Sequence, residues 1–229
     1  MAHSLLDSLN PKQKEAVTWC EGPELVLAGA GSGKTKVLTT KIAYLIEEKG
    51  VAPHHILALT FTNKAAREMR DRVEQLVQGR LLGMQVSTFH AYGLRFLHRH
   101  RLELERLGYP GAFVIFDTSD VKSLVKRLMT AYSIDPKRFD VSWVIGMISK
   151  AKSEADPATL KPDIDARWFD LYQAYHKELK KQGALDFDDL LTVPLHILTV
   201  DNEVREQERS RVDWVLVDEY QDVNRTQYL

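Results

Sequence analysis

One short stretch of the sequence has the residue types needed to hold a chain of phosphates. It consists of Ala28, Gly29, Ala30, Gly31, Ser32, Gly33, Lys34 and Thr35. Glycines allow consecutive backbone N–H groups to point inward at phosphate oxygens, and a helix beginning near Gly33 adds unpaired donors and its positive dipole end. The pattern predicts a nucleotide triphosphate site in which Lys34 reaches the β- and γ-phosphates and the Thr35 hydroxyl binds Mg²⁺.

This stretch departs from the usual phosphate-loop pattern at its first position, where Ala28 replaces glycine. Alanine is small enough to keep a tight turn, so we treat the departure as minor. The alternative is a flexible Gly/Ser turn before an ordinary helix. The apolar run 25–27 before the stretch and the helical periodicity over 34–49 after it favour the phosphate loop.

An acidic pair, Asp218 and Glu219, follows the apolar run 214–217. A carboxylate at the C-terminal tip of a parallel strand faces the crevice where α/β sheets bind ligands, so Asp218 is predicted to hold Mg²⁺ beside the phosphates. Glu219 could orient and deprotonate an attacking water. A solvated turn explains the pair when it is taken alone, and the phosphate loop upstream favours the catalytic interpretation.

The elements expected to position these residues are strands and helices in alternation. Four β-prone apolar runs cover 25–27, 56–59, 85–87 and 214–217. Their continuous hydrophobicity is typical of parallel strands buried on both faces. Helical patterns over 34–49 and 64–78 separate the first three runs, so the beginning of the chain reads β-α-β-α-β and predicts an α/β fold with a parallel sheet.

Between about 90 and 185 the pattern becomes helical, and prolines separate the segments. The expected helices cover 91–106, 119–132, 141–153 and 165–181. We therefore predict an inserted all-helical subdomain over 91–185, with a core domain formed by 1–90 and 186–229.

The composition is that of a protein with enough hydrophobic residues to form a buried core. The chain has 229 residues, 44% of them hydrophobic, and a net charge of -1. Its single cysteine, Cys20, excludes an internal disulfide and a cysteine-rich zinc site and favours the cytoplasm. The apolar runs are too short to span a bilayer, and the first residues lack the features of a secretory signal. Bulk charge neither supports nor excludes nucleic acid as a partner.

Five motifs in order carry a resemblance to a known family. They lie at 29–35, 59–66, 87–90, 186–191 and 217–222. Together they resemble the motifs of UvrD/PcrA/Rep-like superfamily 1 DNA helicases across nearly the whole chain. The resemblance implies a RecA-like P-loop NTPase core, with ATP and Mg²⁺ as cofactors.

The resemblance assigns nucleotide roles to further residues. Gln13 matches the glutamine that reads adenine, and its amide has the required donor and acceptor. A helix start with Asn10 as N-cap and Pro11 at the first position explains the same segment, and both interpretations can hold. Lys36 stands where relatives have arginine near the nucleotide. Gln221 matches the residue that senses the γ-phosphate, which makes Lys34, Glu219 and Gln221 the expected catalytic group.

For nucleic acid, the resemblance implies that Phe61 stacks on a base of single-stranded DNA. By residue type alone, Phe61 would more often be a core residue. The remaining expected contacts to the DNA backbone are Thr62, Asn63, Lys64, Thr88 and His90. A basic cluster over 95–101 either supports the strand or is a solvated helix face. Asp186 is expected to be a helix N-cap without a catalytic role.

The family implies ATP-dependent translocation on single-stranded DNA, with 3′-to-5′ polarity, and unwinding at single-strand/duplex junctions in repair or replication. It also implies that this chain is the N-terminal part of a helicase. A second RecA-like domain would supply the arginines that stabilise charge on the γ-phosphate, so the chain alone should be nearly inactive. The alternatives are a non-catalytic DNA- or protein-binding module and a P-loop ATPase with a substrate other than DNA.

Overall fold

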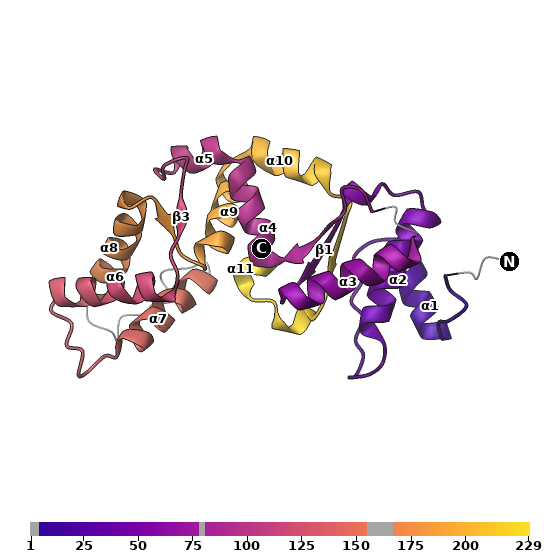
Figure 1. Ribbon diagram of the computed structural model, residues 1–229, viewed down its shortest axis with the longest axis horizontal. Coiled ribbons are helices and arrows are strands. Elements are labelled where there is room, and N and C mark those ends of the chain that lie inside the picture. The colour runs from indigo at the N-terminus through magenta and orange to yellow at the C-terminus, as the bar shows by residue number, and fades with distance from the viewer. Residues whose placement is uncertain (1–4, 78–80, 155–166) are drawn as a thin grey trace. The chain divides into compact units, whose positions relative to one another are not determined.

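The computed structural model describes residues 5–77, 81–154 and 167–229. The chain divides into two compact units (Figure 1). The first contains residues 1–89 and 206–221, and the second contains 90–205 and 222–229. These units follow from packing alone, and the functional division into a core over 1–90 and 186–229 and an insertion over 91–185 stays a prediction.

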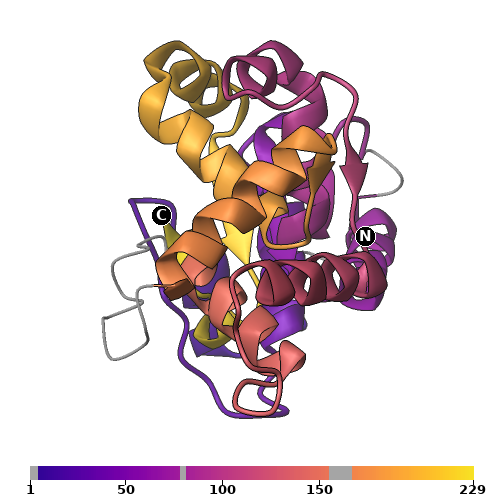
Figure 2. The ribbon, with the colours of Figure 1, turned by 90° about the vertical axis from the view of Figure 1, so that its left-hand side faces the viewer.

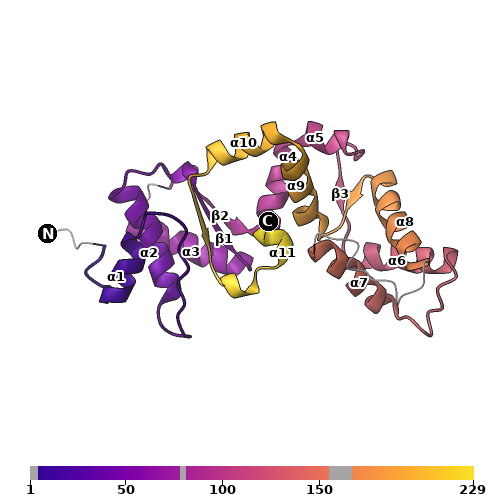
Figure 3. The same cartoon turned by 180° about the vertical axis from the view of Figure 1, so that it is seen from behind.

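The first unit is built on a parallel three-stranded sheet, whose strands β1 and β2 are labelled in Figure 3. The strand order is β2 (Gln85–Thr88), β1 (Ile56–Thr60) and β5 (Trp214–Val217). In the central strand, Ala58 lies opposite Val86 on one side and Leu216 on the other. Every residue of β1 is buried, as its uninterrupted apolar sequence predicts. The expected α/β fold with a parallel sheet is confirmed.

The predicted strand over 25–27 is wrong. Residues Leu25 and Leu27 are 61% and 85% exposed and form no strand pairing within the described ranges. An apolar run becomes a buried strand only where a neighbouring strand takes up its backbone groups. Among the described residues, no strand pairs with the outer edge of β2 or of β5, and the run 25–27 does not take up either position.

Within the described residues, three helices lie wholly in the first unit. They are α1 (Pro11–Thr18), α2 (Lys34–Glu47) and α3 (Asn63–Leu76), and a short 3₁₀ turn, η1 (Pro53–His55), precedes β1. Buried side chains of α2 and α3, such as Ile42 and Met69, pack with Ile56, Ala58 and Leu216 of the sheet in one core. This packing fixes the N-terminal ends of α2 and α3, where the candidate nucleotide and DNA residues lie.

Helices make up most of the second unit. In chain order they are α4 (Phe89–Arg99), α5 (Arg101–Arg106), α6 (Thr118–Ala131), α7 (Val141–Ser153), α8 (Arg167–Lys181), α9 (Asp189–Val200), the start of α10 (Asn202–Arg211) and α11 (Arg225–Tyr228). The residues of α10 from 206 onward belong to the first unit. A small parallel pair joins β3 (Val114–Ile115) to β4 (Ala184–Leu185). The expected helix over 91–106 is two helices, because the backbone of His100 leaves helical geometry at φ -105° and ψ 48°.

Two apolar cores hold this unit together. One joins α6, α7 and α8 (Figure 2) through residues such as Leu128, Ile148 and Leu171. The other joins α4, α5 and α9 through residues such as Phe96 and Ile197. In it, α4 approaches α9 so closely that a Cβ atom on Gly93 would lie 1.8 Å from a backbone oxygen of α9.

Among the described helices, none is both long and apolar enough to cross a membrane.

Candidate functional site

The glycine-rich loop enters α2 with the geometry of an anion site. Gly31 and Gly33 have φ angles of 74° and 88°, a left-handed conformation that favours glycine. Gly33 is the N-cap of α2, and no side chain caps the helix there. The backbone N–H groups of the first turn therefore keep their donors for a ligand. This loop fits a phosphate chain.

The Lys34 ammonium lies on the loop itself. Its Nζ donates to the carbonyl oxygens of Ala28 and Gly29 at 3.1 and 3.2 Å. The Ser32 hydroxyl likewise donates to the Gly29 carbonyl, at 2.7 Å. These neutral acceptors are weaker partners for an ammonium than phosphate oxygens, because charge-assisted hydrogen bonds are about twice as strong. A bound triphosphate can therefore take Lys34 from the loop carbonyls.

Gln13 links α1 to the phosphate loop. Its Oε1 accepts from the Asn10 N–H at 3.0 Å, while Asn10 accepts from the Gln13 N–H at 2.9 Å, so the predicted helix start is confirmed as a capping box. Its Nε2 donates to the Ser32 carbonyl at 3.0 Å. Lys36 instead donates to the Ser8 carbonyl at 2.6 Å, toward the segment before α1. The adenine role of Gln13 and the nucleotide role of Lys36 stay predictions.

The acidic pair follows β5 directly. The Asp218 N–H donates to the Leu59 carbonyl at 3.0 Å, which continues the pairing of β5 with β1. Burial and the neighbouring Glu219 charge raise the pKa of Asp218, and the Lys34 ammonium acts in the opposite direction. Gln221 Nε2 donates to Glu219 Oε2 at 2.5 Å. The sheet thus delivers Asp218 within electrostatic range of the phosphate-loop lysine.

The backbone of Glu219 is strained. Its φ of 52° lies in the left-handed region, which costs a residue with a side chain about 1–3 kcal/mol and is often found at functional sites. The strained turn sends the chain away from β5 and leaves the Glu219 side chain exposed. A general base needs this access to water.

The residues predicted to bind Mg²⁺ suit that ion when it is held together with phosphates. Thr35 is in the first turn of α2, and Asp218 follows β5. In the described part of the chain, no group of three or more His, Cys, Asp or Glu side chains could hold a metal. Mg²⁺ is usually bound by one or two carboxylates with substrate phosphates and water, so one carboxylate and one hydroxyl are a fitting donor set.

The candidate DNA residues of the first unit lie at the start of α3. Thr62 is the N-cap, and its hydroxyl accepts from the Ala65 N–H at 3.0 Å. Asn63 and Lys64 form the first turn and are exposed, beside backbone donors suited to phosphate. Phe61 is half-buried, with its ring centroid 5.7 Å from that of Phe89.

The last two candidate DNA residues differ in exposure. Thr88 is 8% exposed at the end of β2, so it has little surface to offer a strand. His90 belongs to the second unit and is half-buried, and burial lowers its pKa. Its ring stacks on Phe187, with centroids 3.8 Å apart and planes 17° apart.

Residues 9–229 match the profile of the UvrD/REP helicase N-terminal domain. The chain belongs to the UvrD/REP helicase family. It is 43% identical over 234 residues to the ATP-dependent DNA helicase PcrA of Bacillus subtilis (strain 168), covering 100% of this chain and 31% of that protein. It is 42% identical over 231 residues to PcrA of Staphylococcus aureus (strain Mu50), covering 99% of this chain and 31% of that protein. The chain therefore spans about a third of the length of these UvrD/REP relatives.

Sequence reasoning on the UvrD/REP motifs missed Phe187, which is 58% exposed and stacks on His90. The one feature of the sequence that could have indicated an exposed position for Phe187 is that it is an aromatic residue between two aspartates. The N-cap expectation for Asp186 needs correction, because α9 begins at Asp189 with Asp188 before it. Asp186 does accept from the Asp189 N–H at 2.9 Å, and it is also buried in an ion pair with Lys152.

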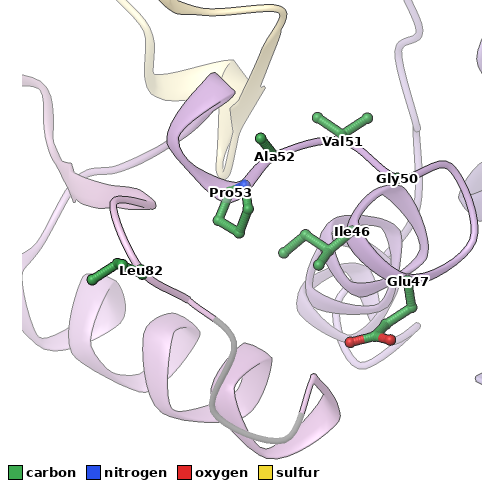
Figure 4. A pocket seen from close by; sticks show the side chains of 7 residues that line it. All are labelled: Ile46, Glu47, Gly50, Val51, Ala52, Pro53 and Leu82. Carbon is green, nitrogen blue, oxygen red and sulfur yellow. The ribbon is translucent and has the colours of Figure 1, made fainter.

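A shallow cavity of about 530 Å³ lies at the other end of α2 from the phosphate loop (Figure 4). Its lining is mostly apolar and comprises Ile46, Glu47, Gly50, Val51, Ala52, Pro53 and Leu82. A helix of 14 residues is about 20 Å long, so this cavity is separate from the nucleotide site.

Proposed function

We propose that this chain is the ATP-binding and strand-binding part of a DNA helicase. The parent activity is translocation along single-stranded DNA driven by ATP hydrolysis, with 3′-to-5′ polarity, and unwinding of duplexes in repair or replication. The relatives named ATP-dependent DNA helicase support this proposal, together with the phosphate loop and the aromatic side chains described above.

The observation that carries the proposal is the convergence of Lys34 and Asp218. They come from positions 34 and 218 of the chain, yet α2, which begins at Lys34, packs in one core with β5, which ends directly before Asp218. The Lys34 charge also opposes the rise in the Asp218 pKa. A phosphate loop that meets an acid after a parallel strand is an arrangement for binding nucleotide with a metal ion. A flexible Gly/Ser turn would not require this convergence.

Each residue then has a step to perform. Lys34 exchanges its two loop carbonyls for oxygens of the β- and γ-phosphates. Bound Mg²⁺, held by Thr35 and Asp218, would neutralise phosphate charge. Glu219 accepts a proton from the attacking water at its exposed carboxylate, and Gln221, already bonded to Glu219, orients that carboxylate and responds to the γ-phosphate.

The DNA strand is held by stacking and by backbone contacts. Phe61 and Phe187 offer aromatic faces to bases, and Thr62, Asn63 and Lys64 offer donors to phosphates at the start of α3. Binding of this kind tolerates different sequences, as a motor that moves along DNA requires.

We also propose that efficient hydrolysis needs a second RecA-like domain of the parent protein. Charge develops on the γ-phosphate in the transition state, and arginines supplied from a partner domain accelerate such reactions by orders of magnitude. The chain alone is expected to bind Mg–ATP weakly and to hydrolyse it slowly. DNA-stimulated turnover at ordinary helicase rates by this chain would contradict that expectation.

Two titrations test the proposal. Calorimetry with Mg–ATP should show binding, and anisotropy of a fluorescein-labelled single-stranded oligonucleotide should show salt-sensitive binding. If the chain binds ATP but does not bind the oligonucleotide, even at low salt, an ATPase with another substrate is favoured. If the chain binds the oligonucleotide but does not bind ATP, a non-catalytic module is favoured.

Aromatic variants test the strand contact with a matched control. Replacement of Phe61 or Phe187 by alanine should weaken oligonucleotide binding by about tenfold each, because stacking contributes about 1–3 kcal/mol per base. Phe169→Ala is the control, since Phe169 is 54% exposed on α8 but has no predicted role at the strand. Equal losses in all three variants would argue against specific stacking.

A further inference from the structure

A buried lysine near the end of α7 is not used by the proposed function. The Lys152 side chain is 1% exposed, and its Nζ donates to Asp186 Oδ2 at 2.6 Å and Asp189 Oδ1 at 2.7 Å. Tyr175 donates its hydroxyl to Asp186 Oδ2 at 2.7 Å. We call Lys152, Asp186, Asp189 and Tyr175 the Lys152 cluster.

The cluster fixes a tight turn between β4 and α9. The Asp186 N–H donates to Asp189 Oδ2 at 3.1 Å, and the Asp189 N–H donates to Asp186 Oδ1 at 2.9 Å. Phe187 lies inside this turn and is exposed, with its ring on His90. The buried charges thus determine where the Phe187 ring is presented.

The backbone of the same lysine holds a second segment. The Thr226 hydroxyl lies 3.0 Å from the Lys152 carbonyl oxygen and 2.8 Å from that of Ser153, at the last turn of α7. Thr226 is 6% exposed and belongs to α11, four residues after Asp222. The chain therefore runs from strained Glu219 through Gln221 to an anchor on α7 within a few residues.

We propose that Thr226 and Lys152 are positioning residues that link the Glu219–Gln221 segment to the Phe187–His90 stacking pair. The Lys152 side chain sets the Phe187 turn, and its carbonyl accepts the Thr226 hydroxyl. A change in the turn after Glu219 that follows nucleotide binding is carried by the anchored α11 to the end of α7, and from there to Phe187. This inference rests on the proposed function, because it concerns how the nucleotide and strand sites act on one another.

The chemistry of the cluster supports a role beyond packing. Burial raises the pKa of Asp189 to about 6. Burial also acts to raise the pKa of Asp186, but the Lys152 charge together with hydrogen bonds from Lys152, Tyr175 and the Asp189 N–H holds that pKa below its usual range. Burying three ionisable groups costs desolvation that an apolar cluster of the same volume would avoid. In return, ion pairs with fixed directions give a turn one defined geometry.

The test measures coupling between two ligands, which is a free energy shared by two sites. Oligonucleotide affinity is measured by anisotropy with and without saturating Mg–AMPPNP, for the wild-type chain and for Thr226→Val, which replaces the hydroxyl by a methyl group. Thr226→Ser keeps the hydroxyl and is the matched control. Thermal unfolding verifies that each variant is folded, and Thr226→Ala replaces the valine variant if valine does not fold.

We expect Mg–AMPPNP to change the wild-type affinity for the oligonucleotide by about fivefold or more. The valine variant should reduce this change to less than about twofold, because one buried hydroxyl bond is lost, and should keep near wild-type affinity for each ligand alone. The serine variant should restore the coupling. A merely structural role for Thr226 would weaken single-ligand binding or stability without changing the ratio.

Three results would overturn the inference, and the first two are distinguishable from the third. Wild-type coupling in a folded Thr226→Val or Thr226→Ala chain, or no coupling in a wild-type chain that binds both ligands, removes the link but leaves the proposed function standing. Failure of the wild-type chain to bind either ligand removes both.

Discussion

The phosphate loop and the Lys152 cluster both use a lysine ammonium to hold oxygen atoms, but the oxygens differ. Lys34 is half-exposed and donates to two neutral carbonyls of its own loop. Lys152 is buried and donates to two carboxylates. The first ammonium can leave its partners for a phosphate at small cost, whereas the second cannot leave without exposing buried charge. Exposure and the charge of the acceptor distinguish Lys34, the lysine proposed to bind phosphate, from Lys152, which has a structural role.

The largest expected effect comes from breaking the buried pair. Lys152→Met should lower the free energy of unfolding by about 3–5 kcal/mol, because two buried carboxylates lose their cation. Urea unfolding followed by circular dichroism measures this loss. Lys34→Met is the matched control and should change stability by less than about 0.5 kcal/mol. Equal effects in the two variants would remove the distinction.

Glycines extend the comparison from side chains to backbone. In the phosphate loop, glycine supplies left-handed φ angles, whereas Gly93 supplies space, because a Cβ there would lie 1.8 Å from the Leu190 carbonyl oxygen. Gly93→Ala should therefore destabilise by about 3 kcal/mol in thermal or urea unfolding. Gly146 is also helical but has open space around its Cβ position, so Gly146→Ala should stabilise by up to about 1 kcal/mol. A loss of stability in Gly146→Ala would contradict the explanation that the space around the Cβ position decides the effect of the substitution.

Lys34→Ala sharpens the functional side of the comparison. The variant should bind Mg–ATP about 50-fold more weakly in calorimetry, because charge-assisted hydrogen bonds contribute about 1.5–3 kcal/mol. Lys12→Ala removes an exposed lysine that pairs with Glu15 on α1, and its affinity should equal that of the wild type. An unchanged affinity in Lys34→Ala would assign the ATP site elsewhere.

The smallest expected effect concerns pH in the second unit. Burial, aided by the Lys152 charge, lowers the pKa of His176 to about 4. Because the unfolded histidine titrates near 6.5, the unfolded state binds more protons between these values, so this contribution to stability is present above pH 6.5 and is lost as pH falls toward 4. By pH 5 the loss is about 2 kcal/mol.

His176→Gln should remove that part of the acid sensitivity. Urea unfolding at pH 7 and pH 5 should show a smaller difference for the variant than for the wild type. Identical pH dependence in the two chains would show that His176 titrates normally in the folded state.

Contiguous motifs explain why candidate nucleotide residues could be proposed from the sequence. The phosphate loop, the start of α3 and the acidic pair after β5 each lie within a few residues, so local chemistry and periodicity identify them. The run 25–27 was misassigned because hydrophobicity indicates that a strand can be buried, whereas pairing depends on which strands occupy the neighbouring positions. Sheet order is a tertiary property.

The Lys152 cluster could not be predicted for a related reason. Lys152 lies 34 residues before Asp186, and the sequence around either residue gives no indication that the two form an ion pair. The acids of 186–189 indicate a helix start, which is part of their role, but the buried cation comes from α7. Phe187 was missed because its exposure depends on the turn that this cation fixes.

The exposed run 25–27 also has a consequence for how the chain behaves in solution. Leu25 and Leu27 are mostly exposed, and Val215 on β5 is 59% exposed. Exposed apolar side chains that the described fold does not cover favour association between chains. At high protein concentration this chain should therefore lose solubility through that segment before its core unfolds, and a charged residue at position 27 is the simplest way to keep it dispersed.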